Sequence, residues 1–220
     1  MLLETSSRWT GWSDAGLSFF YPAICQICRE QRATAHEGYV CADCWTEVRF
    51  IQPPFCERCG LPYEGNITAA FECANCREME LHFRSARSAV AARSVVLDVI
   101  HRYKYLRALW FEPFLADLLI RQAKPVLEKE QWDLIVPVPL HRLKKREREF
   151  NQSERLADQL SLATNIPVNR HLLERVEFTR TQTQLTKSQR VANVRSAFRM
   201  RPGKKLTGEK IIVLDDVLTT

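Results

Sequence analysis

The strongest constraint on the fold of this 220-residue chain is the placement of its eight cysteines. They form four pairs, and within each pair two residues separate the partners. Two thiolates on so short a turn bind one tetrahedral ion, and two such turns complete a structural zinc site. The pairs are Cys25/Cys28, Cys41/Cys44, Cys56/Cys59 and Cys73/Cys76. The spacing therefore predicts a small metal-stabilised module near the N-terminus.

Eight thiolates suffice for two zinc sites of four thiolates each. We expect sequential grouping, in which the first two pairs bind one ion and the last two bind the other, as two stacked ribbons. An interleaved arrangement and a disulfide framework are the alternatives. Glu4 and Asp14 precede the mildly apolar segment 17–21, which is not the pattern of a secretory signal and disfavours disulfides. Because four thiolates leave no open coordination position, both ions should be structural and not catalytic.

After the last cysteine, strand-like and helix-like segments alternate. We expect strands at 85–92, 133–139 and 211–214, a short edge element at 166–168, and helices that begin at Ser94, Pro113 and Asn151, the second ending before Pro125. Strands separated by helices favour an α/β fold with a mainly parallel sheet. The predicted organisation is an N-terminal leader at 1–24, a double zinc ribbon at 25–78 and an α/β domain at 83–220.

The last ten residues combine a strand with polar side chains at its carboxyl end. The apolar run 211–214 has the branched residues of a central parallel strand, and Asp215, Asp216, Thr219 and Thr220 follow it. Ligands of open α/β sheets bind beyond the carboxyl ends of such strands. Carboxylates accept hydrogen bonds from ribose hydroxyls, and a turn that opens a helix holds phosphate. The segment predicts a sugar-phosphate site; a strand followed by an acidic helix cap is the alternative.

A basic segment follows the strand expected at 133–139. Within 142–148 a single acid stands among five cations, which are Arg142, Lys144, Lys145, Arg146 and Arg148. Because parallel strands end at the same sheet edge, we expect this basic loop to lie near Asp215. Such a loop suits a pyrophosphate or a DNA phosphodiester, which arginine binds bidentately. A solvated charged loop is the alternative, and the polar segment 180–193 is interpreted as a mobile loop over the site or as plain surface.

The cysteine pairs, the basic segment and the acidic C-terminal segment follow one another along the chain, and together they resemble the ComF/GntX family of competence-associated proteins. The last ten residues resemble the phosphoribosyl-pyrophosphate (PRPP) signature of type I phosphoribosyltransferases. The matching segments are the cysteine pairs, 101–105, 137–140, 150–152, the spacing of Gln184, Leu185, Arg190, Asn193 and Phe198, and 214–220. Glu149 replaces a glycine usual in the family, and because glutamate resists positive φ we expect a local difference there. The glycine and later threonine of the signature are missing, so we expect a C-terminally truncated chain with an incomplete phosphate site.

The resemblance implies a double zinc ribbon followed by a type I phosphoribosyltransferase-like sheet. It also implies a cytoplasmic role in DNA uptake and natural transformation, with single-stranded DNA or a PRPP-like ligand bound. The net charge of +6 is compatible with phosphate-rich partners, and no apolar stretch approaches the ~18 residues of a membrane span.

Two alternatives remain open at this point. The first is a Mg²⁺-dependent phosphoribosyltransferase that displaces pyrophosphate from PRPP, with an acceptor and catalytic residues that the sequence does not identify. In it, Asp215 and Asp216 would hold the ribose hydroxyls, and Thr219 and Thr220 the 5′-phosphate. The second is an interaction module whose zinc ribbons dock a protein of the DNA-uptake machinery.

Overall fold

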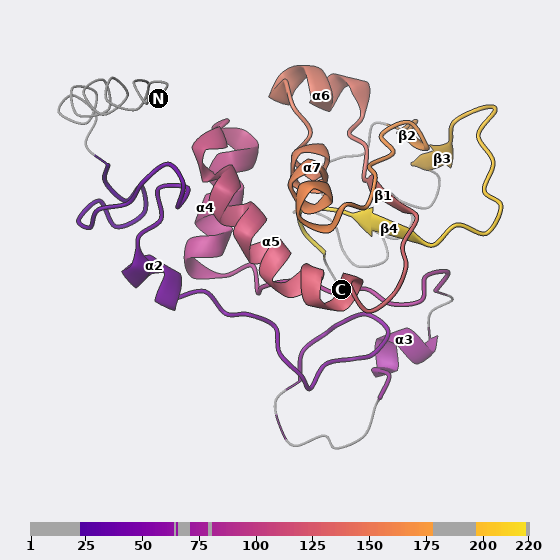
Figure 1. Ribbon diagram of the computed structural model, residues 1–220, viewed down its shortest axis with the longest axis horizontal. Helices are drawn as coiled ribbons and strands as arrows, with labels where there is room; N and C mark the ends of the chain where they lie inside the picture. Colours follow the sequence, from indigo (N-terminus) through magenta and orange to yellow (C-terminus); the bar gives the residue numbers. More distant parts are fainter. Residues whose placement is uncertain (1–22, 64, 66–70, 79–80, 178–196, 219–220) are drawn as a thin grey trace, which may run out of the picture.

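The computed structural model describes residues 23–63, 65, 71–78, 81–177 and 197–218. Figure 1 shows a central group of helices beside a small sheet. The first cysteine-rich segment, which contains Cys25 to Cys44, and the second, which contains Cys56 to Cys76, lie apart from each other. The first segment ends in α2 (Ala42–Thr46) and the second in α3 (Ala74–Glu78). Among the described residues, no helix combines the length and the apolar character that crossing a bilayer requires.

Two helices follow the cysteine-rich region. Helix α4 (Ser94–Tyr105) begins where the sequence predicts, and it buries Val95, Val96 and Val99 on one face. A short 3₁₀ turn, η1 (Leu109–Phe111), leads into α5 (Glu112–Leu127), which has a proline in its first turn as expected. The predicted end of α5 before Pro125 is wrong. Pro125 lies inside the last turn, where its missing N–H removes one hydrogen bond without stopping the helix.

The sheet at the centre of the domain is parallel. Strand β1 (Leu134–Pro137) pairs with β4 (Ile211–Leu214), with Leu134 opposite Ile211 and Pro137 opposite Leu214. A bridge from Ile135 to Val168 lies on the other side of β1, so β1 is flanked on both sides. The α/β class is confirmed. The expected central position of β4 differs from the structure, because among the described residues β4 pairs with β1 alone and Val213 is 60% exposed.

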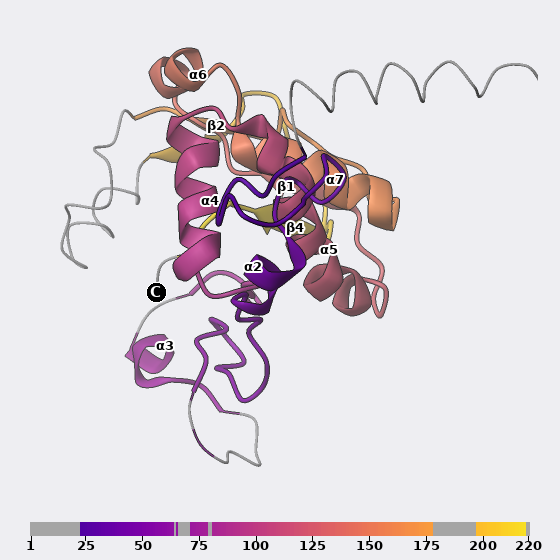
Figure 2. The ribbon, with the colours of Figure 1, turned by 90° about the vertical axis from the view of Figure 1, so that its left-hand side faces the viewer.

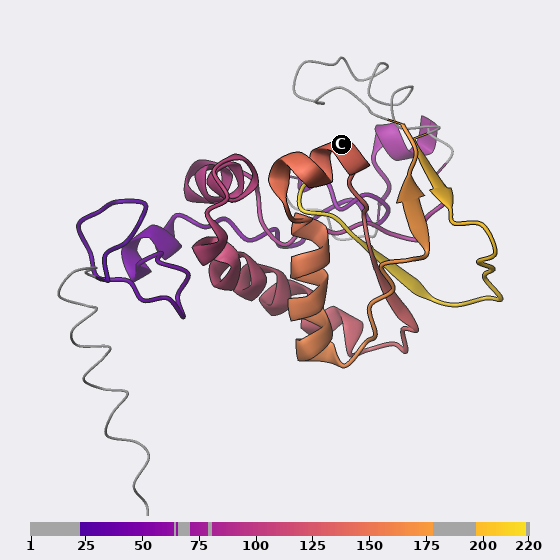
Figure 3. The same ribbon diagram turned by 90° about the horizontal axis from the view of Figure 1, so that it is seen from above.

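Helices α6 (Arg142–Arg148) and α7 (Gln152–Thr164) follow β1. Helix α7 begins at the predicted cap, where the Asn151 side chain accepts a hydrogen bond from the Ser153 amide, and it packs on β1 and α5. The segment 142–148, expected to be a loop, is helical. Glu149 ends this helix at φ 68°, so glutamate adopts the left-handed conformation that glycine favours. Figure 3 shows α6 lying beyond the N-terminal end of α7.

Two further differences from the expected elements concern strands. Residues 85–92 form no regular strand, and only an isolated bridge joins Val90 to Phe50. An antiparallel pair, β2 (Leu173–Arg175) and β3 (Phe198–Met200), was not predicted. These strands have three residues each, which is too short for a recognisable alternating pattern.

One core joins the first cysteine-rich segment to the α/β part. Cys25, Cys41 and Cys44 pack in the same buried cluster as Tyr103 and Phe114. Figure 2 shows the first segment lying against α4 and near α5. The cysteines of the second segment form a separate small cluster with three partly buried apolar side chains, Leu61, Phe71 and Leu81. The first segment is therefore integrated into the domain core, whereas the second has a core of its own.

Candidate functional site

The eight cysteines gather into two groups of four. Cys25, Cys28, Cys41 and Cys44 form one group, and Cys56, Cys59, Cys73 and Cys76 form the other. The grouping is the sequential one that the spacing predicts. Sulfur–sulfur distances are 3.7 Å in the first group and 3.8 Å in the second. A tetrahedron with Zn–S bonds of ~2.3 Å has edges of about 3.8 Å, so the thiols fit two zinc ions.

Backbone amides prepare these thiols for metal. The amides of Ile27 and Cys41 donate to the Sγ atom of Cys25, and the amide of Cys73 donates to the Sγ atom of Cys56. Burial alone would raise the pKa of Cys25 and Cys56, but the amide donors outweigh it and lower both values to about 6. Burial and the neighbouring thiols raise the pKa of Cys41, Cys44, Cys59 and Cys76, so Cys25 and Cys56 are the thiols of the two clusters that ionise most readily. Zinc binds thiolate and not thiol, so metal binding must displace the remaining protons.

The acidic pair lies just beyond the carboxyl end of β4. The Ser153 hydroxyl at the start of α7 donates a 3.0 Å hydrogen bond to Oδ1 of Asp215. The Lys104 ammonium in the last turn of α4 lies 2.8 Å from Oδ2 of Asp216. The side chain of Asn151 donates to the carbonyl of Val138, which follows β1. Both neighbouring helices are therefore tied to the same edge of the sheet, where the sequence predicts the ligand.

Asp215 holds its proton more tightly than an ordinary aspartate. Desolvation by surrounding protein atoms and the charge of Asp216 raise the pKa of Asp215 to about 6. By surface area Asp215 is an exposed residue, so solvent screens part of this effect. The Ser153 hydrogen bond and the Lys104 charge act in the opposite direction without cancelling the increase. The carboxyl of Asp215 therefore stays protonated to a higher pH than that of an ordinary aspartate.

The basic residues of α6 differ in what lies around them. Burial and the charges of Arg175, Arg148 and Lys104 lower the pKa of Lys144, which indicates that these cations share one region. The Arg148 guanidinium lies 5.1 Å from the ring centroid of Tyr105. A separate shallow depression is lined by the other three basic residues of the predicted set, Arg142, Lys145 and Arg146. Lys145 pairs with Glu154 at 3.2 Å.

Sequence reasoning missed three residues at this edge, namely Lys104, Ser153 and Arg175. Lys104 and Ser153 bind the acidic pair directly, and the charge of Asp215 acts on Arg175. Lys104 lies in the segment 101–105, and Ser153 directly follows the segment 150–152. Both segments were singled out for their resemblance to the ComF/GntX family, and this resemblance was the available signal. Their pairing with residues more than 60 positions away could not be read from the chain.

Several predicted residues have other outcomes. Thr219, Thr220 and the segment 180–193 lie outside the described residues. The Nδ1 atom of His141 accepts a hydrogen bond from the Leu143 amide and caps α6. His101 packs beside the Tyr105 ring, with 4.9 Å between ring centroids.

Two thiol clusters that fit zinc, followed by an α/β domain, define a zinc-ribbon protein with a parallel-sheet domain. A family model described as a double zinc ribbon domain matches residues 16–78. Competence protein F of Haemophilus influenzae is 28% identical over 205 residues, which cover 91% of this chain and 87% of that protein. DNA utilization protein YhgH of Salmonella typhimurium is also 28% identical, over 90% of this chain and 86% of that protein. The protein of the same name from Salmonella typhi is 29% identical over the same shares.

These similarities support the resemblance to the ComF/GntX family over about nine-tenths of the chain. No solved structure matches the chain. The domain boundaries at 25–78 and 83–220 and the roles of the residues at the sheet edge stay predictions.

Proposed function

We propose that this protein acts in the utilisation of DNA and that it binds a phosphoribosyl ligand of the PRPP type at the end of β4. The names of its relatives, a competence protein and DNA utilization proteins, support the first part. The second part rests on one observation. Asp215 and Asp216 lie at the carboxyl end of a parallel strand and are held there by Ser153 and Lys104.

The chemistry of this edge matches a sugar with attached phosphates. The two carboxylates can accept hydrogen bonds from a pair of ribose hydroxyls, while Lys144, Arg148 and Arg175 supply positive charge nearby. Carboxylate oxygens are also ligands that Mg²⁺ prefers, and the ion when bound would neutralise pyrophosphate charge. The acidic pair thus provides the ribose contacts and the surrounding cations the phosphate contacts.

Calorimetric titration with Mg²⁺–PRPP of the full-length protein, including any residues that follow Thr220, tests the proposal. Wild-type protein should release or absorb measurable heat with a saturable isotherm, and Asp216→Asn should weaken the affinity at least about tenfold. Asp117→Asn, which removes a carboxylate that pairs with Arg121 on the surface of α5, serves as the matched control and should leave the affinity unchanged. Absence of binding by the wild-type protein would reject the ligand part of the proposal.

A second candidate function is the binding of single-stranded DNA. Tyr105 is 49% exposed, its ring is beside His101, and Arg148 lies over it. Exposed aromatic rings beside cations are the usual platform for stacked bases and phosphate backbone. Together with the depression lined by basic residues of α6, this surface favours a strand that crosses the end of α4.

A further inference from the structure

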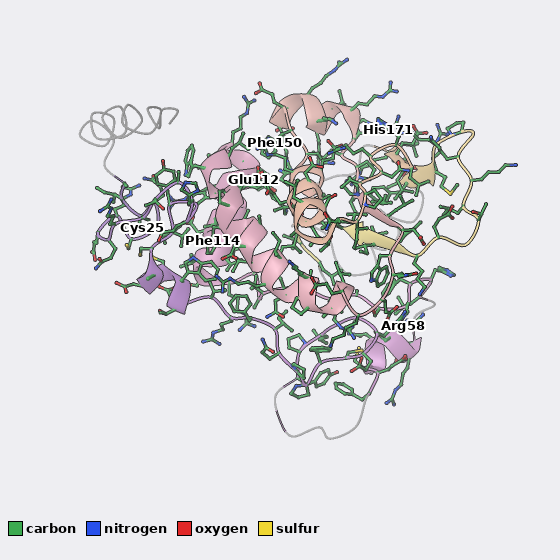
Figure 4. All side chains as sticks on the ribbon, in the orientation of Figure 1. Cys25, Arg58, Glu112, Phe114, Phe150 and His171 are labelled. Carbon is green, nitrogen blue, oxygen red and sulfur yellow. The ribbon has the colours of Figure 1, made fainter. Side chains whose placement is uncertain are left out.

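The segment His101–Tyr105 forms the last turns of α4, and its residues contact three different parts of the molecule. Arg102 donates a 2.7 Å hydrogen bond to the carbonyl of Gln26 in the first cysteine-rich segment. Tyr103 is buried and donates to Glu112 of α5, whose position among α4, α5 and α7 is visible in Figure 4. Lys104 reaches Asp216 at the sheet edge. The role of Lys104 follows from this third contact.

The Lys104–Asp216 pair is largely removed from water. The two side chains are only 17% and 16% exposed, whereas most ion pairs of the described residues include a side chain that is more than a third exposed. A partly buried carboxylate needs a counter-charge, because desolvation would otherwise oppose its ionisation. Lys104 therefore supplies the counter-charge of Asp216.

Several cations lie in the region of this pair. Lys104, Arg148 and Arg175 act on Lys144, and the acids that oppose them there are Glu147 and Asp215. Crowded like charges oppose one another and are stabilised when an anion binds among them. A phosphate group that enters this region thus offers the Lys104 ammonium an alternative partner to Asp216.

We propose that Lys104 is an exchangeable counter-ion of the ligand site. It neutralises Asp216 in the unliganded protein, and it moves to a phosphate oxygen of the ligand when a divalent cation or a ribose hydroxyl takes over Asp216. The inference rests on the proposed phosphoribosyl function and adds a residue that selects the ligand. A selected ligand must carry a phosphate for Lys104, and it must also bring a divalent cation or ribose hydroxyls for Asp216.

Lys104→Met tests this role, because methionine keeps the aliphatic length and removes the charge. Two titrations are compared, one with Mn²⁺ alone and one with Mg²⁺–PRPP. Without a competing ammonium on Asp216, the variant should bind Mn²⁺ about threefold or more tightly than wild type. Without the ammonium for phosphate, it should bind Mg²⁺–PRPP about tenfold more weakly. Lys104→Arg should bind Mg²⁺–PRPP nearly as wild type does.

Lys124→Met is the matched control, since it removes an exposed lysine that pairs with Glu128 on α5. It should change neither affinity, and zinc content with far-ultraviolet circular dichroism verifies that each variant is folded. Opposite changes in the two affinities of Lys104→Met support the inference. Two unchanged affinities, or a loss of both in a folded variant, overturn it. Wild-type protein that binds neither Mn²⁺ nor Mg²⁺–PRPP would instead reject the proposed function itself.

Discussion

The hydroxyl of Ser153 donates a 3.0 Å hydrogen bond to Oδ1 of Asp215, which joins the first turn of α7 to the end of β4. Ser153 is buried, and the adjacent Asn151 binds the carbonyl of Val138 after β1. One helix start thus holds the ends of both parallel strands together. The acidic pair is consequently positioned by the core and not by a loop alone.

The raised pKa of Asp215 predicts a pH-dependent stability. Its pKa is about 6 in the folded protein and near 3.8 in an unfolded chain, so the folded form binds the extra proton between these values. Asp215 therefore contributes stability at pH 4 that is lost as the pH rises through about 6. Asp215→Asn should remove this loss. Between pH 4.5 and pH 7, the free energy of unfolding of the variant should therefore rise relative to that of wild type by up to about 1 kcal/mol, a value reduced for solvent screening.

Urea unfolding of both proteins at the two pH values measures this difference. Ser153→Ala removes a hydrogen bond to the ionised carboxyl, so it should move the midpoint of the pH effect upward. An Asp215→Asn variant that loses stability relative to wild type as the pH rises would show that the sign of the shift is wrong.

The two zinc sites should differ in their effect on the domain. Metal analysis should give about two zinc ions per chain, and one after Cys28→Ser or Cys59→Ser. The first cluster packs in the domain core and its segment accepts a hydrogen bond from Arg102, whereas the second has a separate small core. Loss of the first zinc ion should therefore lower the melting temperature of the α/β domain, and loss of the second should leave it nearly unchanged.

Differential scanning calorimetry with zinc analysis distinguishes these outcomes, and each cysteine variant is the control for the other. Equal decreases in the melting temperature of the domain for Cys28→Ser and Cys59→Ser would contradict the asymmetry. Wild-type protein purified without chelator that contains almost no zinc would contradict the zinc-ribbon interpretation as a whole.

Gly38 sits where the first cysteine-rich segment meets α5. It has φ +61°, and a Cβ atom there would lie 2.7 Å from the backbone nitrogen of Phe114. Gly38→Ala should therefore destabilise the protein by about 3 kcal/mol through backbone strain and overpacking together. Gly203 has φ +78° with no atom within 4 Å, so Gly203→Ala should cost only the strain, about 1 kcal/mol. Chemical denaturation that gives equal losses would show that the contact with Phe114 is unimportant.

Single-stranded DNA binding, the second candidate, predicts a specific salt dependence. If Arg142 and Arg146 contact phosphates, replacing both by alanine should reduce the slope of log K against log salt by about 1.4 for a single strand. Arg121→Ala, which removes a surface arginine of α5 paired with Asp117, should leave the slope unchanged. Fluorescence anisotropy with a labelled oligonucleotide at several salt concentrations measures the slopes. Equal slopes for the wild type and the double variant would exclude this face of α6.

The features that sequence reasoning predicted well are those set by local spacing. The two-residue gaps between cysteines determine which thiols share a turn, and the apolar runs at 134–137 and 211–214 form parallel strands as expected. The start of α7 follows from the capping side chain of Asn151. In each case the information lies within a few residues of the feature that it specifies.

The features that were missed depend on tertiary contacts. Helix α6 contains a single apolar residue, Leu143, and buries none, so its sequence shows no apolar periodicity and its charges suggested a loop. Pro125 is tolerated because α5 ends two residues later, and within the described part of the chain residues 85–92 form one isolated bridge, from Val90 to Phe50. The partners of the acidic pair, Lys104 and Ser153, come from two helices that only the fold brings to the same edge.

Hydrogen–deuterium exchange with and without Mg²⁺–PRPP locates the ligand on the protein. Binding at the end of β4 should slow exchange at residues 211–218, at the start of α7 and in the last turn of α4, with little change in α3. Slower exchange confined to segments away from this edge, with 211–218 unaffected at saturating ligand, would contradict it.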